Sequence, residues 1–472
     1  MPDLDPRDTW REECGVFAAR TSRPTDLATL AQLGLFALQH RGQESAGITV
    51  SNGREVRTHR GMGLVAQVFD EAGISRVRAS DLTGVLGHVR YSTTGSSRIE
   101  NAQPVTLRCS KGTLALAHNG NIVNARPLRD RLMAGGFTFQ TSGDTEVMAN
   151  LIASHADVDT VEATVRAMGE VAGGFTVGLL DEQRVLGLRD RHGVRPLLLG
   201  RIEDHTWIIA SEPAAIEVAG GEVVRDVNPG ELVVLEERGP RSVQALQPTP
   251  APCSFEYIYF ARADSRLDGT DVHAARVRMG EQLWREAAVE ADVVIGVPES
   301  GLAAAIGYSR ASRIPYDIGL LKSPYAGRTF IQPTQALREE KVRLKLAATS
   351  AVAGKRVVLV DDSIVRGTTS AKIVQILREA GATQVHFRVS SPPLKFPCHY
   401  GIDIDSRKHL IAADHSVEEV RRQIGADSLH HLSEAGLRAA IGARTGLCLA
   451  CFNGEYPAGE PAEADKLALE RR

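Results

Sequence analysis

The stretch VVLVDDSIVRGTTSAKIVQILREAG, residues 357–381, predicts the architecture of the second half of the chain. Residues 357–360 are apolar and mostly β-branched, which is typical of a buried strand, and they lead directly into the carboxylates of Asp361 and Asp362. A turn of small and hydroxyl-bearing residues follows, and then a helix with a periodic apolar face and a closing glycine. Backbone N–H groups at such a helix N-terminus can bind a phosphate, while the paired acids can face hydroxyls or a metal ion.

This run matches, position by position, the phosphoribosyl pyrophosphate signature of type I phosphoribosyltransferases, so the second half of the chain resembles that α/β family. The resemblance implies that Asp361 and Asp362 meet the ribose hydroxyls and Mg²⁺. It also implies that the loop after them surrounds the 5′-phosphate and binds phosphoribosyl pyrophosphate through Ser363, Arg366, Gly367, Thr368 and Thr369. An ordinary α/β crossover with exposed acids is the alternative.

The composition of the 472 residues, with 43% hydrophobic and 24% charged residues, is that of a soluble globular protein of two or three domains. A formal net charge of −3 gives no electrostatic reason to expect nucleic acid or an anionic membrane surface as a partner. The amino terminus is acidic and polar rather than a secretory or transit signal, and no apolar run approaches the roughly 20 residues that cross a bilayer. Six cysteines in so long a chain do not indicate a disulfide scaffold, so we expect a cytoplasmic location.

The first half of the chain, up to about residue 245, alternates short strands with a few helices. This order predicts stacked antiparallel sheets between helical layers. The expected strands are residues 47–50, 85–89, 114–117, 176–180, 207–210 and 231–235. The expected helices are residues 26–39, 124–134, 145–154 and 159–168.

The pattern changes to βαβ after the proline-containing segment GPRSVQALQPTPAPCSF, residues 239–255, which is the best candidate for a linker. A strand–helix alternation of this kind predicts a parallel, doubly wound sheet. The expected elements are a helix over 272–289, a strand over 292–297, a helix over 301–309, the crossover described above and a strand over 384–389. The expected organisation is a leader of residues 1–13, domains of 14–245 and 246–455, and a loose tail of 456–472.

Cys14 follows a short polar leader and precedes an apolar, strand-like run. A cysteine at the first position of a chain can use its own α-amine as the general base, so that no separate histidine is needed. We therefore expect removal of residues 1–13 by self-cleavage between Glu13 and Cys14. Taken alone, the same pattern also fits a buried strand cysteine behind a polar leader.

Six segments of the first half together resemble the class II glutamine amidotransferase domain, an N-terminal-nucleophile fold with αββα layering. The backbone turn at Arg41 and Gly42 resembles the one that lines the nucleophile and contributes to glutamine binding in that family. The matching segments, in order, are CGVF (14–17), LQHRGQESAGI (38–48), GHVRYSTTG (87–95), NAQPV (101–105), LAHNGNIVN (116–124) and TSGDTEV (141–147).

Several side chains in these segments have functional groups that suit a glutaminase. HNGN at a strand end predicts a turn that presents the Asn119 amide and the Gly120 N–H to an oxyanion. Arg90 offers a planar guanidinium suited to the α-carboxylate of glutamine, and Asp144 offers an anion suited to its α-ammonium group. Surface charges and a simple hairpin turn are the alternative interpretation of each residue taken singly.

Two further segments complete the expected transferase site. IGVPESGLAAAIG, residues 295–307, resembles the pyrophosphate loop, with Ser300 or Glu299 facing Mg²⁺. Glu299 stands where relatives usually have aspartate, which leaves the identity of the ligand open. The basic run over 322–346 resembles the flexible loop that covers phosphoribosyl pyrophosphate in the glutamine phosphoribosylpyrophosphate amidotransferase family, although a solvated basic face is the usual explanation of such a run. The substrate contacts implied in it are Lys322, Arg328 and Lys341.

Four cysteines of the second half form a possible four-thiolate site. They are Cys253, Cys398 and the CxxC pair Cys448 and Cys451. Their spacing does not distinguish structural zinc from an iron–sulfur cluster. The members of the family that have a leader peptide carry a 4Fe–4S cluster on the matching cysteines, so the resemblance implies one structural cluster per subunit. Cys109 has no partner in this pattern and is interpreted as a packing residue.

The resemblance covers residues 14–455 and implies the reaction of the glutamine phosphoribosylpyrophosphate amidotransferase family. Glutamine, phosphoribosyl pyrophosphate and water would give 5-phosphoribosylamine, glutamate and pyrophosphate, the first committed step of purine synthesis. One Mg²⁺ per subunit, a homotetramer and feedback inhibition by purine nucleotides are implied as well. The alternatives are another glutamine-dependent transferase, such as one that aminates a sugar phosphate, and a non-catalytic purine-nucleotide sensor on the same folds.

Overall fold

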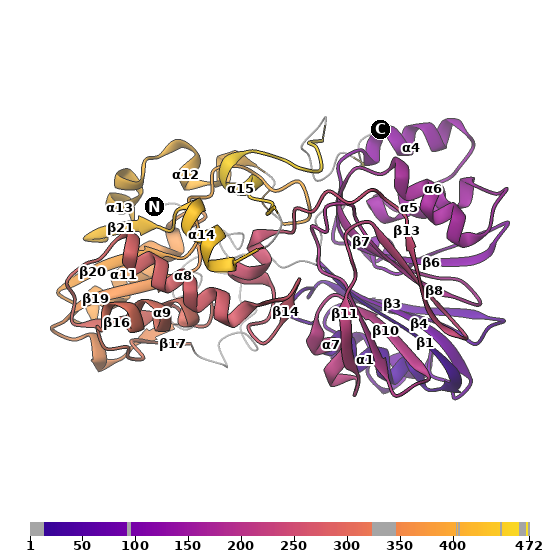
Figure 1. The fold of residues 1–472 in the computed structure, drawn as a ribbon, viewed down its shortest axis with the longest axis horizontal. Coiled ribbons are helices and arrows are strands. Elements are labelled where there is room, and N and C mark those ends of the chain that lie inside the picture. The colour runs from indigo at the N-terminus through magenta and orange to yellow at the C-terminus, as the bar shows by residue number, and fades with distance from the viewer. Residues whose placement is uncertain are drawn as a thin grey trace.

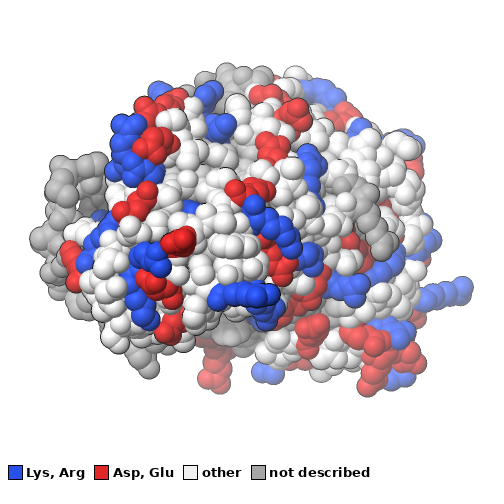
Figure 2. Space-filling model, turned by 60° about the vertical axis from the view of Figure 1, so that its left-hand side comes forward, with Lys and Arg blue, Asp and Glu red and all other residues white. Residues whose placement is uncertain are grey.

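The structure is a computed structural model that describes residues 14–91, 96–322, 346–402, 404, 406–443, 446–461, 469 and 470. Two domains lie side by side, the first in indigo to magenta and the second in red through orange to yellow (Figure 1). On the face drawn in Figure 2, acidic and basic side chains are interspersed rather than gathered into a region of one sign. Among the described residues, no helix is long and apolar enough to span a membrane.

The first domain is built on two antiparallel sheets packed face to face. One has seven strands in the order β11-β9-β10-β1-β4-β2-β3, and the other has six in the order β13-β12-β8-β7-β6-β5. The strands are β1 Gly15–Thr25, β2 Ser45–Ser51, β3 Val56–Met62, β4 Leu82–Arg90, β5 Val105–Cys109, β6 Gly112–Ile122, β7 Gly173–Leu180, β8 Val185–Arg189, β9 Leu198–Ile202, β10 Thr206–Ala210, β11 Glu222–Asp226, β12 Glu231–Glu236 and β13 Gly239–Gln244. Buried side chains of both sheets, including Val16, Leu86 and Ala117, form the core between them.

Helices cover the outer faces of these sheets and complete the αββα layering. α1 Leu27–Ala37 and α7 Pro213–Val218 contribute to the core on the outer side of the seven-stranded sheet. α4 Ala125–Ala134, α5 Asp144–Ser154 and α6 Thr160–Glu170 pack on the six-stranded sheet. The N-terminal-nucleophile fold class is confirmed, and each strand and helix expected in this half lies within or overlaps an observed one.

The second domain has a parallel sheet with helices on both faces. Its strand order is β16-β19-β20-β21, and all three pairings are parallel. Alternate residues of β19 enter different cores: Val358 and Val360 pack with α8 and α9, whereas Val357 and Leu359 pack with α11 and α13. The elements are β16 Val293–Gly296, β19 Arg356–Asp361, β20 Gln384–Val389, β21 Ser428–His431, α8 Val272–Glu286, α9 Leu302–Ser312, α11 Thr368–Glu379, α13 Val417–Ile424 and α14 Glu434–Ile441. The predicted doubly wound sheet is therefore confirmed.

Two segments differ from the sequence-based expectation. The first six residues of the expected linker form β13, which pairs with β12 along its whole length. Part of the expected loose tail is packed: Ala458 and Leu469 are buried, and the Glu470 carboxylate accepts hydrogen bonds from Ser96 N at 2.7 Å and Ser142 Oγ at 2.9 Å. The tail is packed through partners more than 300 residues away in sequence, which composition does not reveal. β13 instead forms a hairpin with the adjacent β12, which the prolines of this segment had obscured. The leader, residues 1–13, lies outside the described residues.

Candidate active sites

Cys14 immediately precedes β1, a central strand of the seven-stranded sheet. It therefore lies at the end of the sheet where β1 begins beside the last residues of β4. Its side chain is buried, and its thiol donates to the carbonyl oxygen of Tyr91 at 3.3 Å. Burial raises the pKa of this thiol to about 11, although the Tyr91 contact and the nearby Arg90 guanidinium lower it in part. At this pKa the thiol is neutral near pH 7, so a base must remove its proton before it can act as a nucleophile.

One pocket contains Cys14 and two of the four residues predicted to bind glutamine, Arg90 and Asp144. Its lining includes Cys14, Arg90, Gly120 and Asp144, together with His118, for which the sequence had given no role. Arg90 ends β4 and is almost fully buried. A thiol, a guanidinium and a carboxylate in one pocket match the electrophilic carbon, the α-carboxylate and the α-ammonium group of an amino-acid amide.

Asp144 is held as an anion in this pocket. It begins α5, accepts a hydrogen bond from Ile122 N at 3.3 Å and lies 3.4 Å from His118 Nδ1. Burial opposes ionisation of Asp144, but the histidine, the backbone N–H group and Arg90 outweigh it, so the pKa of this carboxyl is lowered. His118 therefore orients and stabilises the carboxylate. It belongs to the HNGN motif, which was the only sequence signal for it.

The predicted HNGN turn is wrong, because these residues lie inside β6 and pair with β7. Gly120 has φ +122, and a Cβ at this position would lie 2.1 Å from the carbonyl oxygen of Gly174. The glycine is therefore required for close approach of the two strands rather than for a reversal of the chain. Asn119 does not line the pocket described above. Its amide nitrogen and oxygen are buried, and neither has a hydrogen-bond partner among the described residues.

The turn after α1 contributes its backbone to this site, whereas the Arg41 side chain points elsewhere. A Cβ on Gly42 would lie 2.6–2.8 Å from backbone atoms of Val89 and Arg90, so the turn packs directly against the end of β4. The Arg41 guanidinium pairs with Glu212, and its Nη2 donates to Glu256 Oε2 at 2.6 Å. The structure does not bring this guanidinium into the pocket, so any contribution of Arg41 to glutamine binding comes from its main chain.

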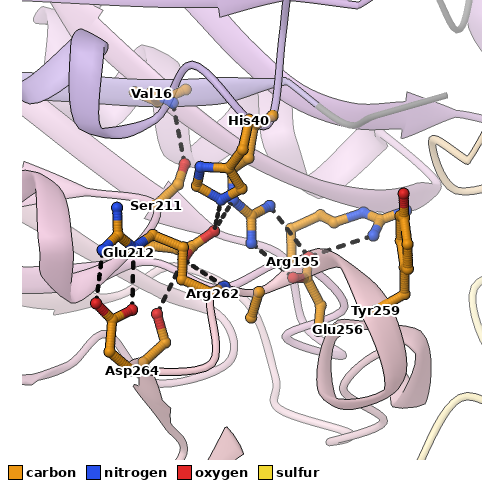
Figure 3. A network of polar contacts seen from close by, with 12 residues as sticks. Val16, His40, Arg195, Ser211, Glu212, Glu256, Tyr259, Arg262 and Asp264 are labelled. Atoms are coloured by element: carbon orange, nitrogen blue, oxygen red, sulfur yellow. Dashed lines mark hydrogen bonds and ion pairs between the residues drawn. The ribbon is translucent and has the colours of Figure 1, made fainter. Parts of the chain in front are cut away.

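Glu212 and Glu256 belong to a network of polar contacts (Figure 3), and the buried Arg41 guanidinium pairs with both carboxylates. Besides Arg41, Glu212 has three further polar neighbours, His40 Nε2 at 2.7 Å, Arg262 N at 3.0 Å and Ser265 Oγ at 2.9 Å. Burial opposes ionisation of Glu212, but Arg41 and His40 outweigh it and lower the pKa of this carboxyl. Sequence reasoning missed the network because its members share no motif and come from distant segments.

The transferase site lies at the carboxyl ends of two parallel strands. β16 leads into the loop that contains Ser300, and β19 ends at Asp361, with Gly296 opposite Val360 in the register. Ser300 Oγ donates to Asp361 Oδ1 at 3.0 Å, while Glu299 is exposed. The two predicted motifs therefore meet, and Ser300 rather than Glu299 contacts the acids.

The two acids of this site are poorly disposed to carry two negative charges. Burial raises the pKa of Asp361 well above its usual range, and the neighbouring Asp362 raises it further. Burial also raises the pKa of Asp362, against hydrogen bonds from Ser363 and Ser300. A cation removes such repulsion, and carboxylate and hydroxyl oxygens are ligands that Mg²⁺ prefers. These residues thus fit a magnesium ion.

The predicted phosphate loop leads into the N-terminus of α11. Gly367 is the N-cap residue, and Thr368 and Thr369 form the first turn, whose N–H groups point toward the loop. Thr368 Oγ1 is buried without a hydrogen-bond partner among the described residues, as expected of a group that awaits a ligand. Lys322 ends β17 Leu320–Lys322 and is exposed. Arg328 and Lys341 lie outside the described residues.

The four predicted cysteines line one pocket between the linker and the C-terminal segment. Burial raises the pKa of the Cys451 thiol, and the other three thiols raise it further. All four lie in the described part of the chain, and no three of their sulfur atoms are within 4.8 Å of one another. A single zinc ion holds thiolates at about 2.3 Å, which puts their sulfur atoms about 3.8 Å apart. The arrangement of the four thiols thus fits a polynuclear cluster, whose thiolates bind different metal atoms, better than a single zinc ion.

Comparisons with known proteins agree with both halves of the chain. A glutamine amidotransferase domain matches residues 88–218, and a phosphoribosyl transferase domain matches residues 272–391. The amidophosphoribosyltransferase of Bacillus subtilis is 47% identical over 94% of this chain and 94% of its own length. That of Archaeoglobus fulgidus is 49% identical over 92% of this chain and 95% of its own length.

Two solved structures resemble the whole molecule. Glutamine phosphoribosylpyrophosphate amidotransferase from B. subtilis, complexed with ADP and GMP, has a TM-score of 0.89 and 46% identity, covering 94% of this chain and 98% of that one. A structure described as the allosteric regulatory enzyme of purine biosynthesis has a TM-score of 0.91 and 45% identity, covering 97% and 99%. An N-terminal-nucleophile glutaminase domain joined to a type I phosphoribosyltransferase domain defines a glutamine-dependent phosphoribosyltransferase. More narrowly, the chain belongs to the amidophosphoribosyltransferase family.

Replacing Glu212 with glutamine should lower the free energy of unfolding by about 3–5 kcal/mol, because it leaves the buried Arg41 undercompensated. Urea titration followed by fluorescence measures this change. Glu222→Gln, in an exposed pair with Arg201, is the matched control and should leave the curve nearly unchanged. Equal effects of the two substitutions would contradict the role given to the buried network.

Proposed function

We propose that the chain carries out the two half-reactions of its family, one in each domain. At Cys14, glutamine and water give glutamate and ammonia, and at Asp361 and Asp362 the ammonia displaces pyrophosphate from phosphoribosyl pyrophosphate. The products are 5-phosphoribosylamine, glutamate and pyrophosphate, and the reaction is the first committed step of purine synthesis. One observation carries the proposal. The chain that forms the Cys14 pocket also joins its two transferase motifs, through the hydrogen bond from Ser300 to Asp361.

In the glutaminase half, Arg90 binds the α-carboxylate of glutamine and Asp144 binds its α-ammonium group. The Cys14 thiolate attacks the amide carbon, the C–N bond breaks to release ammonia, and water hydrolyses the resulting thioester. The Gly120 residue lines the pocket, and its N–H is proposed to stabilise the oxyanion. Asn119 does not line the pocket, so its proposed share in the oxyanion site rests on the family resemblance and on its buried amide, which has no hydrogen-bond partner among the described residues.

The base in this mechanism is the α-amine of Cys14 after removal of the leader. Among the described residues, the only hydrogen bond of the Cys14 thiol is to a backbone carbonyl, which cannot take up its proton. An α-amine on the same residue titrates near pH 8 and supplies the missing base. The cleavage is proposed to be self-catalysed by the thiol.

Intact-mass measurement of the purified chain should therefore give the mass of residues 14–472, with cysteine at the amino terminus. Cys14→Ala is the matched control and should retain residues 1–13, because the thiol required for cleavage is absent. A chain that keeps the leader and still hydrolyses glutamine would contradict the assignment of the base.

In the transferase half, the N-terminus of α11 and the loop before it bind the 5′-phosphate, and Asp361 and Asp362 face the ribose hydroxyls. Ser300 and the two acids would hold Mg²⁺, one ion per subunit. Bound there, the metal would supply positive charge to the departing pyrophosphate. Lys322, at the end of β17, is positioned to begin the basic segment proposed to cover the substrate.

The four-cysteine site is proposed to hold one 4Fe–4S cluster per subunit. Support comes from the spread of the four sulfur atoms and from their common pocket. Cys253 also pairs with Cys448 through a backbone bridge, with Cys448 N donating to Pro252 O at 2.9 Å. The cluster would be structural, cross-linking the linker to the C-terminal segment, since the proposed reaction transfers no electrons.

Regulation by purine nucleotides is proposed from the relatives. The B. subtilis structure was solved with ADP and GMP, and the second structure is described as an allosteric regulatory enzyme. A homotetramer is proposed from the family resemblance of the sequence alone. The alternative of a non-catalytic sensor has no support, because a sensor would not need a thiol, a guanidinium and a carboxylate gathered in one amino-acid pocket.

Cys14→Ala should abolish glutamine-dependent synthesis but leave synthesis from added ammonia close to that of the parent chain, because the transferase site is separate. Pyrophosphate release with either nitrogen donor measures both routes. Asp362→Asn is the complementary variant and should lower both routes by at least about tenfold, since both use the same diacid. Loss of both activities in Cys14→Ala would refute the assignment of glutamine hydrolysis to Cys14 and of synthesis to a separate transferase site.

Protein purified without oxygen should contain about four iron and four sulfide per chain and absorb visible light. Cys451→Ser should lose most of the iron, whereas Cys109→Ser should keep it, because Cys109 lies in β5 of the other domain. Stoichiometric zinc without iron would contradict the cluster.

A further inference from the structure

A loop of the second domain lies directly against the strand that carries the oxyanion donors in the first domain. Asn121 Nδ2, one residue after Gly120, donates a hydrogen bond to the carbonyl oxygen of His399 at 2.9 Å. Two residues further along this loop, Gly401 has φ +112, and a Cβ there would lie 2.9 Å from Gly120 Cα and 3.0 Å from Gly120 C. These contacts join segments that are about 280 residues apart in sequence.

Gly120 is thus confined on two sides. A Cβ on Gly120 would meet the carbonyl oxygen of Gly174 at 2.1 Å, so β7 lies close on that side. Gly401 lies close on another side, and a Cβ added at Gly401 would overlap the Gly120 main chain. Close-packed backbone of this kind cannot shift without moving one of its neighbours.

The loop is itself firmly held. The Tyr400 carbonyl oxygen accepts hydrogen bonds from Arg195 Nε at 3.0 Å and Arg195 Nη2 at 2.6 Å, and Arg195 is completely buried. The Tyr400 hydroxyl donates to Gly459 O at 2.9 Å and accepts from Ala458 N at 2.9 Å. Arg195 also lies 3.5 Å from Glu256, which connects the loop to the ion-pair network of Figure 3.

We propose that residues 399–401 of the phosphoribosyltransferase domain set the position of the oxyanion donors for the glutaminase reaction, with Gly401 and Asn121 as positioning residues. The proposal rests on the proposed function of Cys14, Asn119 and Gly120. An oxyanion donor must lie about 2.7–3.1 Å from the charged oxygen, and a misplacement of about 1 Å costs on the order of 100-fold in rate. The Gly401 main chain prevents such a displacement of Gly120 by contact alone.

The test uses the mature holoenzyme with Gly401→Ala. The added methyl group must push Gly120 away, so we expect kcat with glutamine to fall about 10- to 100-fold, with KM for glutamine within about twofold. Synthesis from ammonia, iron content and alkylation of Cys14 by iodoacetamide should stay at parental values. These results would show an effect across the domain boundary, because a substitution in the transferase domain would impair only the glutaminase half-reaction.

Gly442→Ala is the matched control. Gly442 also has a positive φ, of +68, but a Cβ there meets no atom within 4 Å, so the variant experiences backbone strain without the collision. It should keep both activities.

Asn121→Ala provides a second measurement should Gly401→Ala fail to fold or lose iron. It removes the hydrogen bond to His399, and we expect kcat with glutamine to fall about fivefold, again with ammonia-dependent synthesis unchanged. Parallel loss of both routes, a higher KM at unchanged kcat, or no effect in either folded variant would overturn the positioning role. A parent chain without glutaminase activity would instead overturn the proposed function, so the two failures are distinguishable.

Discussion

The buried ion pairs around Glu212 and Glu256 are the constraint on which the arrangement of the two domains depends. Charged groups removed from water are tolerated only when each has a close partner, because an unpaired buried charge costs several kcal/mol. Arg41 comes from the turn after α1, Glu212 from the start of α7, and Glu256 from the segment that leads into the second domain. A relative displacement of these segments would leave at least one charge without compensation.

These ion pairs also fix the main chain at two places beside the glutamine pocket. Arg41 precedes Gly42, whose main chain packs against that of Arg90, so the guanidinium pairing also fixes the turn beside the nucleophile. Arg195 pairs with Glu256 and binds the Tyr400 carbonyl oxygen, which fixes the loop behind Gly120. One buried network therefore supports two parts of the pocket lining, Arg90 and Gly120, although none of its carboxylates lines the pocket.

Local pattern was enough to predict the layered sheets of both domains, whereas the roles of the site residues were inferred from the family resemblance. The Asp361–Asp362 run gave strand, loop and helix correctly because its hydrophobic period and turn residues act over short distances. HNGN was misread as a turn, because the positive φ of Gly120 serves the approach of β7, which no local pattern reveals. Local pattern also could not predict the Arg41 ion pairs or the burial of Leu469, since their partners lie in distant segments.

The chemistry of the three centres follows from one physical property, the burial of acidic groups. Burial raises the pKa of the Cys14 thiol, of the Asp361 carboxyl and of the Cys451 thiol, so at each centre the fold disfavours the ionised form. Each proposed function needs the ionised form, which a nearby base or a bound cation favours. A freed α-amine, Mg²⁺ and iron are the three agents that would meet this need. Each agent would therefore offset the cost of ionisation that burial imposes at its own centre.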